Sequence, residues 1–149
     1  MQKRKALLFT AALATAAAFA VRAKAQFAKA EDGVKYRQSA FTMMANHMGR
    51  LSAMARGQVP FDAASAQASA RLIETLSHLP WEAFVPGSTS RGLKAEPWAD
   101  AADFKARSER LAGETAKLPA AAGSLETLRQ QVGATGGACK NCHDKYRNS

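Results

Sequence analysis

Four segments of the chain repeat apolar residues at the spacing of an amphipathic helix, and this periodicity constrains the fold more than any other feature. In the first segment, Phe41, Met48 and Ala55 follow one another at seven-residue spacing, with Met44 and Leu51 in the intervening turns. No segment alternates apolar and polar residues as a strand would. The four segments cover residues 30–56, 62–80, 100–119 and 124–146. Because each has one apolar face to bury, the sequence predicts an all-α fold, an antiparallel four-helix bundle.

Residues that start or stop helices mark the ends of these segments. Asp62 and Ser124 have side chains that cap helix N-termini, and prolines follow the first three segments. The longest connection, residues 80–97, contains Trp81 and Phe84. A solvated loop does not need such side chains, so we expect this one to fold back over an apolar surface. Two alternatives fit these side chains: they cover the edge of a bound group, or they pack as the apolar residues of an ordinary loop.

The N-terminal residues have the pattern of a secretory signal peptide. Three basic residues precede a short apolar run from Ala6 to Val21, and Ala23, Lys24 and Ala25 form a small-x-small cleavage site. The run is too short to anchor the chain stably in a membrane. We therefore expect residues 1–25 to be removed and residues 26–149 to form one domain. The compartment predicted for this exported domain is the periplasm.

The charge of the chain favours no nucleic-acid or membrane partner. The formal net charge is +9, but five of the 21 basic residues and none of the 12 acidic residues lie in residues 1–25, which leaves +4 for the rest. The remaining basic residues are scattered among Asp and Glu and form no basic patch. The sequence also contains no paired carboxylates, catalytic triad or phosphate-binding loop, so we predict that the protein is not an enzyme.

The two cysteines of the chain lie in the last helical segment, in the sequence ACKNCHDKYR. At 100° per residue, Cys139, Cys142 and His143 occupy one arc of this helix. Three kinds of chemistry fit such a set: a disulfide, a zinc ion or a covalently attached haem. Redox chemistry of the thioredoxin type needs the Cys-X-X-Cys pair at the start of a helix beside parallel strands, and no strand is predicted. Zinc would need a fourth ligand, and neither His47 nor His78 forms a ligand-spaced pair.

Covalent haem is the interpretation we favour. In a Cys-X-X-Cys-His motif the two thiols add to the vinyl groups of one haem and the following imidazole binds the iron. The sequence therefore predicts one haem c, attached through thioethers at Cys139 and Cys142, with His143 as the metal ligand. The haem would lie beside the C-terminal helix of the bundle.

The chain resembles the cytochrome c prime family, the class II c-type cytochromes, over essentially all of residues 26–149. Three stretches carry the resemblance: KYRQSAFTMMANHMGR, LPWEAF and VGATGGACKNCHDKYR. The resemblance implies that Arg37 and Gln38 contact the haem propionates and that Phe41 blocks the open face of the iron. It also implies a homodimer packed through the first two helices. A role in binding NO, alone or alongside electron transfer, is a further implication.

The residues of the first helix are consistent with these roles but do not require them. Arg37 and Phe41 are four residues apart and share a face. An arginine within an apolar face is costly unless paired, and a propionate would provide a partner; the alternative is a side chain that reaches out to solvent. The alternative for Phe41 is ordinary core packing. Arg147 follows His143 by one turn and could approach the haem or simply end the helix.

An iron held by His143 alone, beneath an apolar surface, would be five-coordinate and high-spin. NO and CO bind without a hydrogen-bond donor, whereas O₂ binding gains from one, so the expected ligands are NO and CO. The alternative is a low-spin, six-coordinate electron carrier with Met44 or Met43 as sixth ligand. Such a carrier would need a redox partner, which the sequence does not identify.

Overall fold

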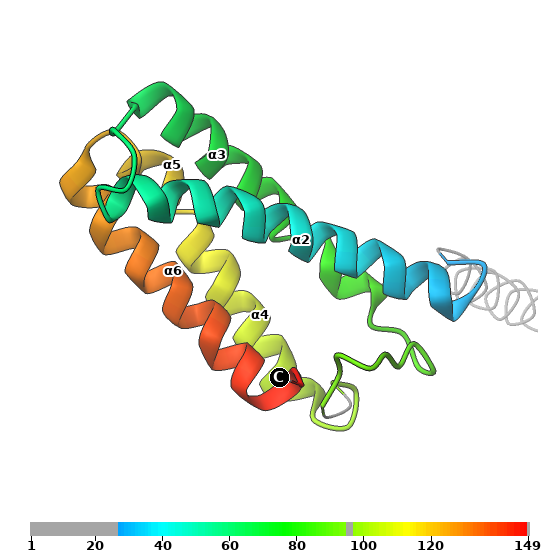
Figure 1. The fold of residues 1–149 in the computed structure, drawn as a ribbon. Coiled ribbons are helices and arrows are strands. Elements are labelled where there is room, and N and C mark those ends of the chain that lie inside the picture. The colour runs from blue at the N-terminus through cyan, green and yellow to red at the C-terminus, as the bar shows by residue number, and fades with distance from the viewer. Residues whose placement is uncertain (1–26, 95–96, 149) are drawn as a thin grey trace, which may run out of the picture.

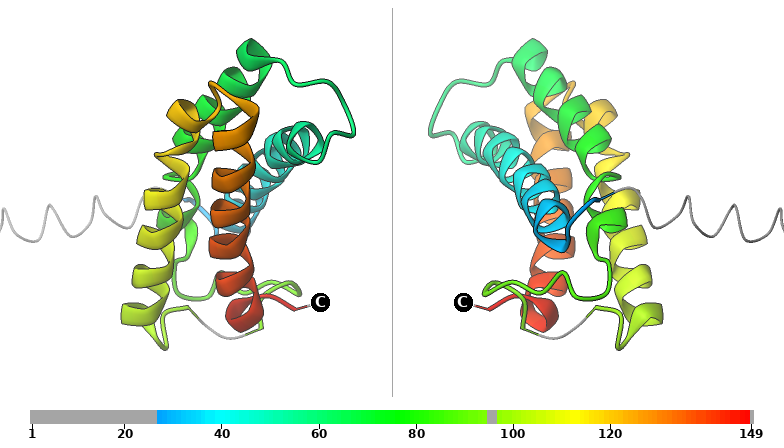
Figure 2. Two further views of the ribbon diagram at one scale, coloured as in Figure 1. Left: turned by 90° about the vertical axis from the view of Figure 1, so that its left-hand side faces the viewer. Right: turned by 90° about the vertical axis from the view of Figure 1, so that its right-hand side faces the viewer.

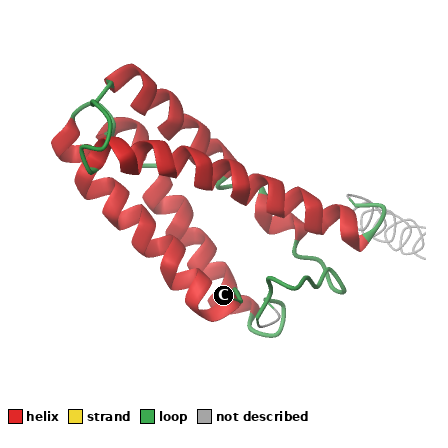
Figure 3. Cartoon of the chain, viewed as in Figure 1, coloured by secondary structure: helices red, strands yellow, loops and turns green. Residues whose placement is uncertain are grey.

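The computed structural model describes residues 27–94 and 97–148 and contains four long helices (Figure 1). These are α2 (Ala30–Ala55), α3 (Ala63–Leu76), α4 (Ala101–Thr115) and α6 (Leu125–Tyr146). Two one-turn helices, η1 (Pro80–Ala83) and α5 (Leu118–Ala121), lie in the connections. No described residue belongs to a strand (Figure 3). The prediction of an all-α four-helix bundle is confirmed, whereas the predicted signal peptide lies outside the described residues.

The helices begin where the capping residues predict. The Asp62 carboxylate accepts a hydrogen bond from the Ser65 N–H at 2.6 Å, and the Ser124 hydroxyl accepts one from the Thr127 N–H at 3.3 Å. Two predicted helix ends are too late: α3 ends at Leu76, four residues before Pro80, and α4 ends at Thr115. Pro80 and Pro119 instead lie in the first turns of η1 and α5, where the missing N–H of proline costs no hydrogen bond. None of the described helices has the length and apolar character needed to cross a membrane.

The apolar core fills one end of the bundle. There α2 ends and α6 begins, and the Arg129 side chain donates a hydrogen bond of 2.7 Å to the Ala55 carbonyl. Toward the other end the two helices diverge (Figures 1 and 2). The core consists of small and branched side chains with essentially no exposed surface: Leu51, Ala66, Ala70, Ile73, Leu118, Ala122 and Leu128.

The long connection between α3 and α4 crosses the open end of the bundle (Figure 1). Residues 81–88, which we call the cover segment, end in a tight turn in which the Ser88 N–H donates to the Val85 carbonyl at 3.0 Å. Pro86 and Gly87 occupy the centre of this turn, and Gly87 has a φ of 83°, which is typical of a type II turn. Further along, the Lys94 N–H donates to the Tyr146 carbonyl at 2.9 Å. The connection is thereby tied to the end of α6.

Replacement of Leu51 by Ala should lower the free energy of unfolding by about 2–5 kcal/mol, since Leu51 has no exposed surface and its loss leaves a cavity in the core. Urea unfolding followed by circular dichroism measures this loss. The matched control is Leu72→Ala, which removes the same atoms from a side chain that is 46% exposed. Equal losses in the two variants would contradict the position of the core.

Candidate haem site

A cavity of about 750 Å³ opens at the end of the bundle where α2 and α6 diverge. Its wall is mostly apolar and is formed by α2, α4, α6, the cover segment and residues 90–93, together with Ile73 of α3. The volume lies within the range of cofactor sites, which is about 300–1,000 Å³. This part of the bundle is therefore built around a space large enough for a cofactor.

Cys139, Cys142 and His143 line this cavity from α6, as the helical period predicts. Both cysteines are half-buried and free, so neither thiol is consumed by a disulfide. Burial raises the pKa of the Cys139 and Cys142 thiols, and for Cys142 the Arg107 guanidinium opposes this rise. Burial, and next the nearby Arg147 guanidinium, lower the pKa of His143. A neutral imidazole is the form that binds a metal.

Gly136 leaves space beside the cysteines, one turn before Cys139 on the same wall. A Cβ built on Gly136 would meet no atom within 4 Å outside its own helix turn. The wall at this point is bare backbone, against which a flat group can lie. Gly133 and Gly137 of the same helix do not line the cavity.

The cavity wall formed by α2 carries the other predicted site residues. Arg37, Gln38 and Phe41 all line the cavity that the α6 motif faces. Met44 also lines it and is only 7% exposed, whereas Met43 is 46% exposed and lies away from it. Tertiary structure thus brings all six predicted site residues together, and their individual contacts with haem stay predictions.

Arg37 does not reach solvent, because its side chain is only 3% exposed. Its Nη1 donates to the Ala83 carbonyl and to the Ser88 hydroxyl, each at 2.8 Å, and its Nη2 donates to the Ser88 carbonyl. These bonds use three of the five N–H groups of the guanidinium. Burial lowers the pKa of Arg37. The alternative of a solvent-directed arginine is therefore wrong.

Five aromatic rings form one continuous cluster along the cavity. Phe41 lies 5.7 Å from Trp81 and 6.5 Å from Phe84, measured between ring centroids. Phe84 is 4.8 Å from Phe104, which is 5.2 Å from Tyr146. All five rings line the cavity. The expectation that the long connection folds back over an apolar surface is confirmed.

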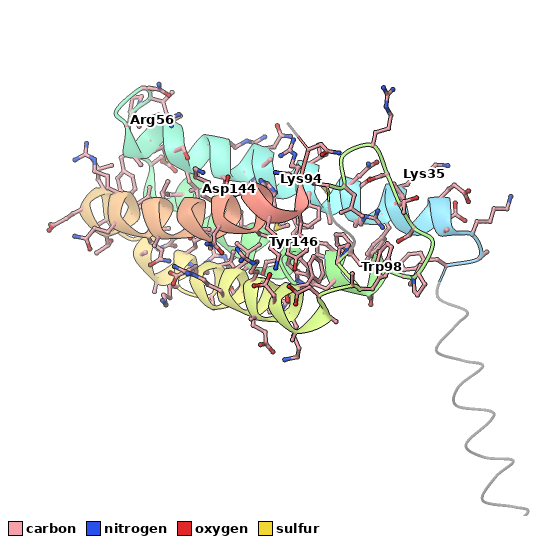
Figure 4. All side chains as sticks on the ribbon, turned by 90° about the horizontal axis from the view of Figure 1, so that it is seen from below. Lys35, Arg56, Lys94, Trp98, Asp144 and Tyr146 are labelled. Atoms are coloured by element: carbon pink, nitrogen blue, oxygen red, sulfur yellow. The ribbon has the colours of Figure 1, made fainter. Side chains whose placement is uncertain are left out.

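A charged network holds the end of α6 that carries His143 against α4. Asp103 accepts hydrogen bonds from Arg107 at 2.7 Å, and from Lys145 and the Tyr146 hydroxyl, each at 2.9 Å. These donors, Arg107 first, hold the pKa of Asp103 far below its ordinary value. Figure 4 shows Tyr146 at the end of α6, beside α4. Sequence reasoning missed Asp103, because its partners on α6 lie more than 40 residues along the chain and only the i,i+4 spacing to Arg107 is visible locally.

The structure also places His47 and Arg147. His47 is half-buried, and its Nδ1 lies 3.3 Å from the Ser69 hydroxyl of α3. Arg147 lines the cavity, as one alternative required, and its backbone forms an isolated bridge with Leu93. The end of α6 is therefore closed by a backbone contact as well as by the charged network.

The residues present fit a haem. A Cys-X-X-Cys-His motif faces a largely apolar cavity, Gly136 leaves room beside it, and among the described residues Arg37 forms no ion pair with a carboxylate although it is buried. This arrangement defines a c-type haem protein built on a helical bundle.

Comparison with known proteins identifies the family. The family model for cytochrome c′ matches residues 32–147. A cytochrome c′ from Alcaligenes xylosoxydans xylosoxydans is 49% identical over 124 residues, covering 82% of this chain and 98% of that protein. One from Rubrivivax gelatinosus is 50% identical over 127 residues, with the same coverages. A solved nitric oxide complex of a variant cytochrome c prime from Alcaligenes xylosoxidans matches with a TM-score of 0.78 at 48% identity, covering 83% of this chain and 99% of that one. The chain belongs to the cytochrome c′ family, and membership implies a covalently bound c-type haem.

Replacement of Asp103 by Asn should destabilise the protein in a pH-dependent way. A carboxyl whose pKa is lowered by folding stabilises the folded state above its unfolded pKa and loses this effect as the pH falls. The difference in urea midpoint between wild type and Asp103→Asn should therefore be full above about pH 5 and shrink toward about pH 2. The control is Glu109→Gln, which breaks an exposed pair with Lys105 and should change little. A midpoint difference that is independent of pH would contradict the role of Asp103.

Proposed function

We propose that the protein is a periplasmic gas-binding cytochrome with one haem c whose iron is five-coordinate and high-spin. The observation that carries this proposal is the pairing of two walls across one cavity. The α6 wall carries Cys139, Cys142 and His143, and the α2 wall carries Phe41. A motif that attaches haem thus shares its cavity with an apolar side chain that has no atom to donate to iron.

Each wall would hold a different part of the haem. Cys139 and Cys142 would form the two thioethers, and His143 would be the axial ligand. The two N–H groups of Arg37 that are free of the cover segment, together with the exposed Gln38, would bind the propionates. When bound, the haem supplies an iron that takes up a diatomic gas.

The aromatic cluster around Phe41 favours NO and CO over O₂. Trp81 is the ring beside Phe41 with an N–H group, and this group already donates to the Ser77 carbonyl at 2.6 Å. It is therefore not free to bond to a gas ligand, and bound O₂ gains most from such a bond. The nitric oxide complex solved for the Alcaligenes xylosoxidans relative supports NO as a ligand.

The remaining parts of the proposal concern the setting of the protein. We infer that residues 1–25 direct export and are removed, that the mature protein binds gas without being an enzyme, and that it forms a homodimer as resemblance to the family implies. Electron transfer alongside gas binding is compatible with this proposal.

A second candidate function rests on Met44, which is buried in the cavity wall. Its thioether could bind the iron opposite His143 and produce a low-spin electron carrier. Met43 is a weaker candidate for this ligand, because it is 46% exposed and does not line the cavity. The gas-binding protein and the electron carrier would therefore be distinguished by whether a protein side chain occupies the sixth coordination position of the iron.

The mature protein, made in cells that attach haem, should have the mass of residues 26–149 plus one haem. Its ferric EPR and absorption spectra at neutral pH should be those of high-spin, five-coordinate iron, because His143 is the one protein ligand expected. A Cys139→Ala, Cys142→Ala double variant is the control and should lack the added mass. A low-spin ferric signal would favour the electron carrier with Met44.

Replacement of Phe41 by Ala should raise the association rate of CO with the reduced protein. A gas molecule must displace the ring in the wild type, and its removal should give an increase on the order of tenfold, which corresponds to about 1.4 kcal/mol of barrier. Stopped-flow or flash photolysis measures the rate. Phe61→Ala, which removes a phenylalanine packed on the core and outside the cavity wall, is the control. An unchanged rate in Phe41→Ala would mean that Phe41 does not lie over the iron.

A further inference from the structure

Arg37 makes contacts that a propionate ligand would not need. Its guanidinium reaches from α2 to both ends of the 83–88 part of the cover segment, the Ala83 carbonyl and the two oxygens of Ser88. Between these bonds, its central carbon lies 4.5 Å from the centroid of the Phe84 ring, within the range of a cation–π interaction. A planar guanidinium can donate several hydrogen bonds in fixed directions while it lies over a ring, whereas the ammonium group of a lysine is a point charge that cannot reproduce this geometry.

These contacts are energetically important because Arg37 is a buried cation. Among the described residues no carboxylate pairs with it, so neutral oxygens and one ring replace its hydration within the chain. A buried charged donor that loses its acceptor pays the cost of desolvation without compensation. The hydrogen bonds of Arg37 are therefore satisfied within the chain when the cover segment lies against α2.

Ser88 is held rigidly in the position where it meets Arg37. Its N–H closes the turn on the Val85 carbonyl at 3.0 Å, and its hydroxyl donates to the same carbonyl at 2.7 Å. That hydroxyl also accepts from Arg37, so one side chain joins the turn to α2. Ser88 is 1% exposed, whereas the neighbouring Thr89 is exposed.

The part of the cover segment held in this way carries the rings that pack on Phe41. Trp81 and Phe84 stack on one another with a centroid separation of 6.3 Å and an interplanar angle of 18°. Both contact Phe41, which follows Arg37 by one turn of α2. For Phe41 to swing away from the iron, these two rings must yield as well.

We propose that Arg37 is a positioning residue that clamps the cover segment onto α2 through Ser88 and thereby sets how fast a gas ligand passes Phe41. The inference rests on the proposed function for its link to gas binding. The clamp does not exclude a propionate contact, since two N–H groups of Arg37 are not used by the cover segment. Removal of the Ser88 hydroxyl tests the clamp and leaves Arg37 itself unchanged.

The experiment compares the holoprotein variants Ser88→Ala, Arg37→Lys and Thr89→Ala with the wild type. Hydrogen exchange measured by mass spectrometry over residues 81–88 reports on opening of the cover segment, and CO association with the reduced protein reports on gas access. Ser88→Ala should speed exchange about tenfold, because an N–H of a buried charged group loses its acceptor. CO association should rise several-fold with an unchanged absorption spectrum. Arg37→Lys should also speed exchange and CO association although it keeps the charge, and Thr89→Ala should do neither.

Each contrary result overturns a defined part of the inference. Equal exchange in Ser88→Ala and Thr89→Ala would overturn the clamp. Faster exchange with unchanged CO association would overturn the link to gas access. Loss of a contact that is merely structural would loosen the cover segment without changing the rate of CO association. Faster exchange in Arg37→Lys but not in Ser88→Ala would overturn the role of the Ser88 hydroxyl in the clamp, because the Ala83 and Ser88 carbonyls still accept from Arg37 in Ser88→Ala. A wild-type protein that binds no CO would overturn the proposed function, while the exchange data would still decide whether the clamp exists.

Discussion

The divergence of α2 and α6 is the constraint on which the rest of the structure depends. At one end the two helices share a core that includes Leu51 and Leu128, neither of which has exposed surface. At the other end no such core forms between them, and a cavity of about 750 Å³ takes its place. Helices with apolar faces must bury those faces against something. The haem that the family carries is suited to this space, and a haem bound there would complete the core at this end of the bundle.

The buried charge of Arg37 links this cavity to the connection that crosses it. An isolated cation in the wall would be costly, and its bonds to Ala83 and Ser88 reduce that cost. The same bonds order the segment that presents Trp81 and Phe84 to Phe41. The need of the buried Arg37 charge for hydrogen-bond acceptors therefore also fixes the apolar surface that a gas ligand would meet. In this way the stability of the cover segment is connected to the proposed function.

Local signals predicted much of the fold. Capping at Asp62 and Ser124 depends on residues three apart, so the starts of α3 and α6 could be read from the sequence. The ends of α3 and α4 could not, because a proline marks where a helix must stop and not where tertiary packing ends it earlier. The network at Asp103 was missed for a related reason: its partners Lys145 and Tyr146 are 42 and 43 residues away.

The sequence by itself determined that Cys139, Cys142 and His143 share one face of a helix, because the helical period places residues three and four apart together. It also determined that Arg37 and Phe41 share a face of another helix. Only the tertiary structure decided that these two faces meet across one cavity and that Arg37 turns three of its donors to the cover segment. Those contacts join residues 46 and 51 positions apart, and no local periodicity encodes them, since they form only when the helices pack.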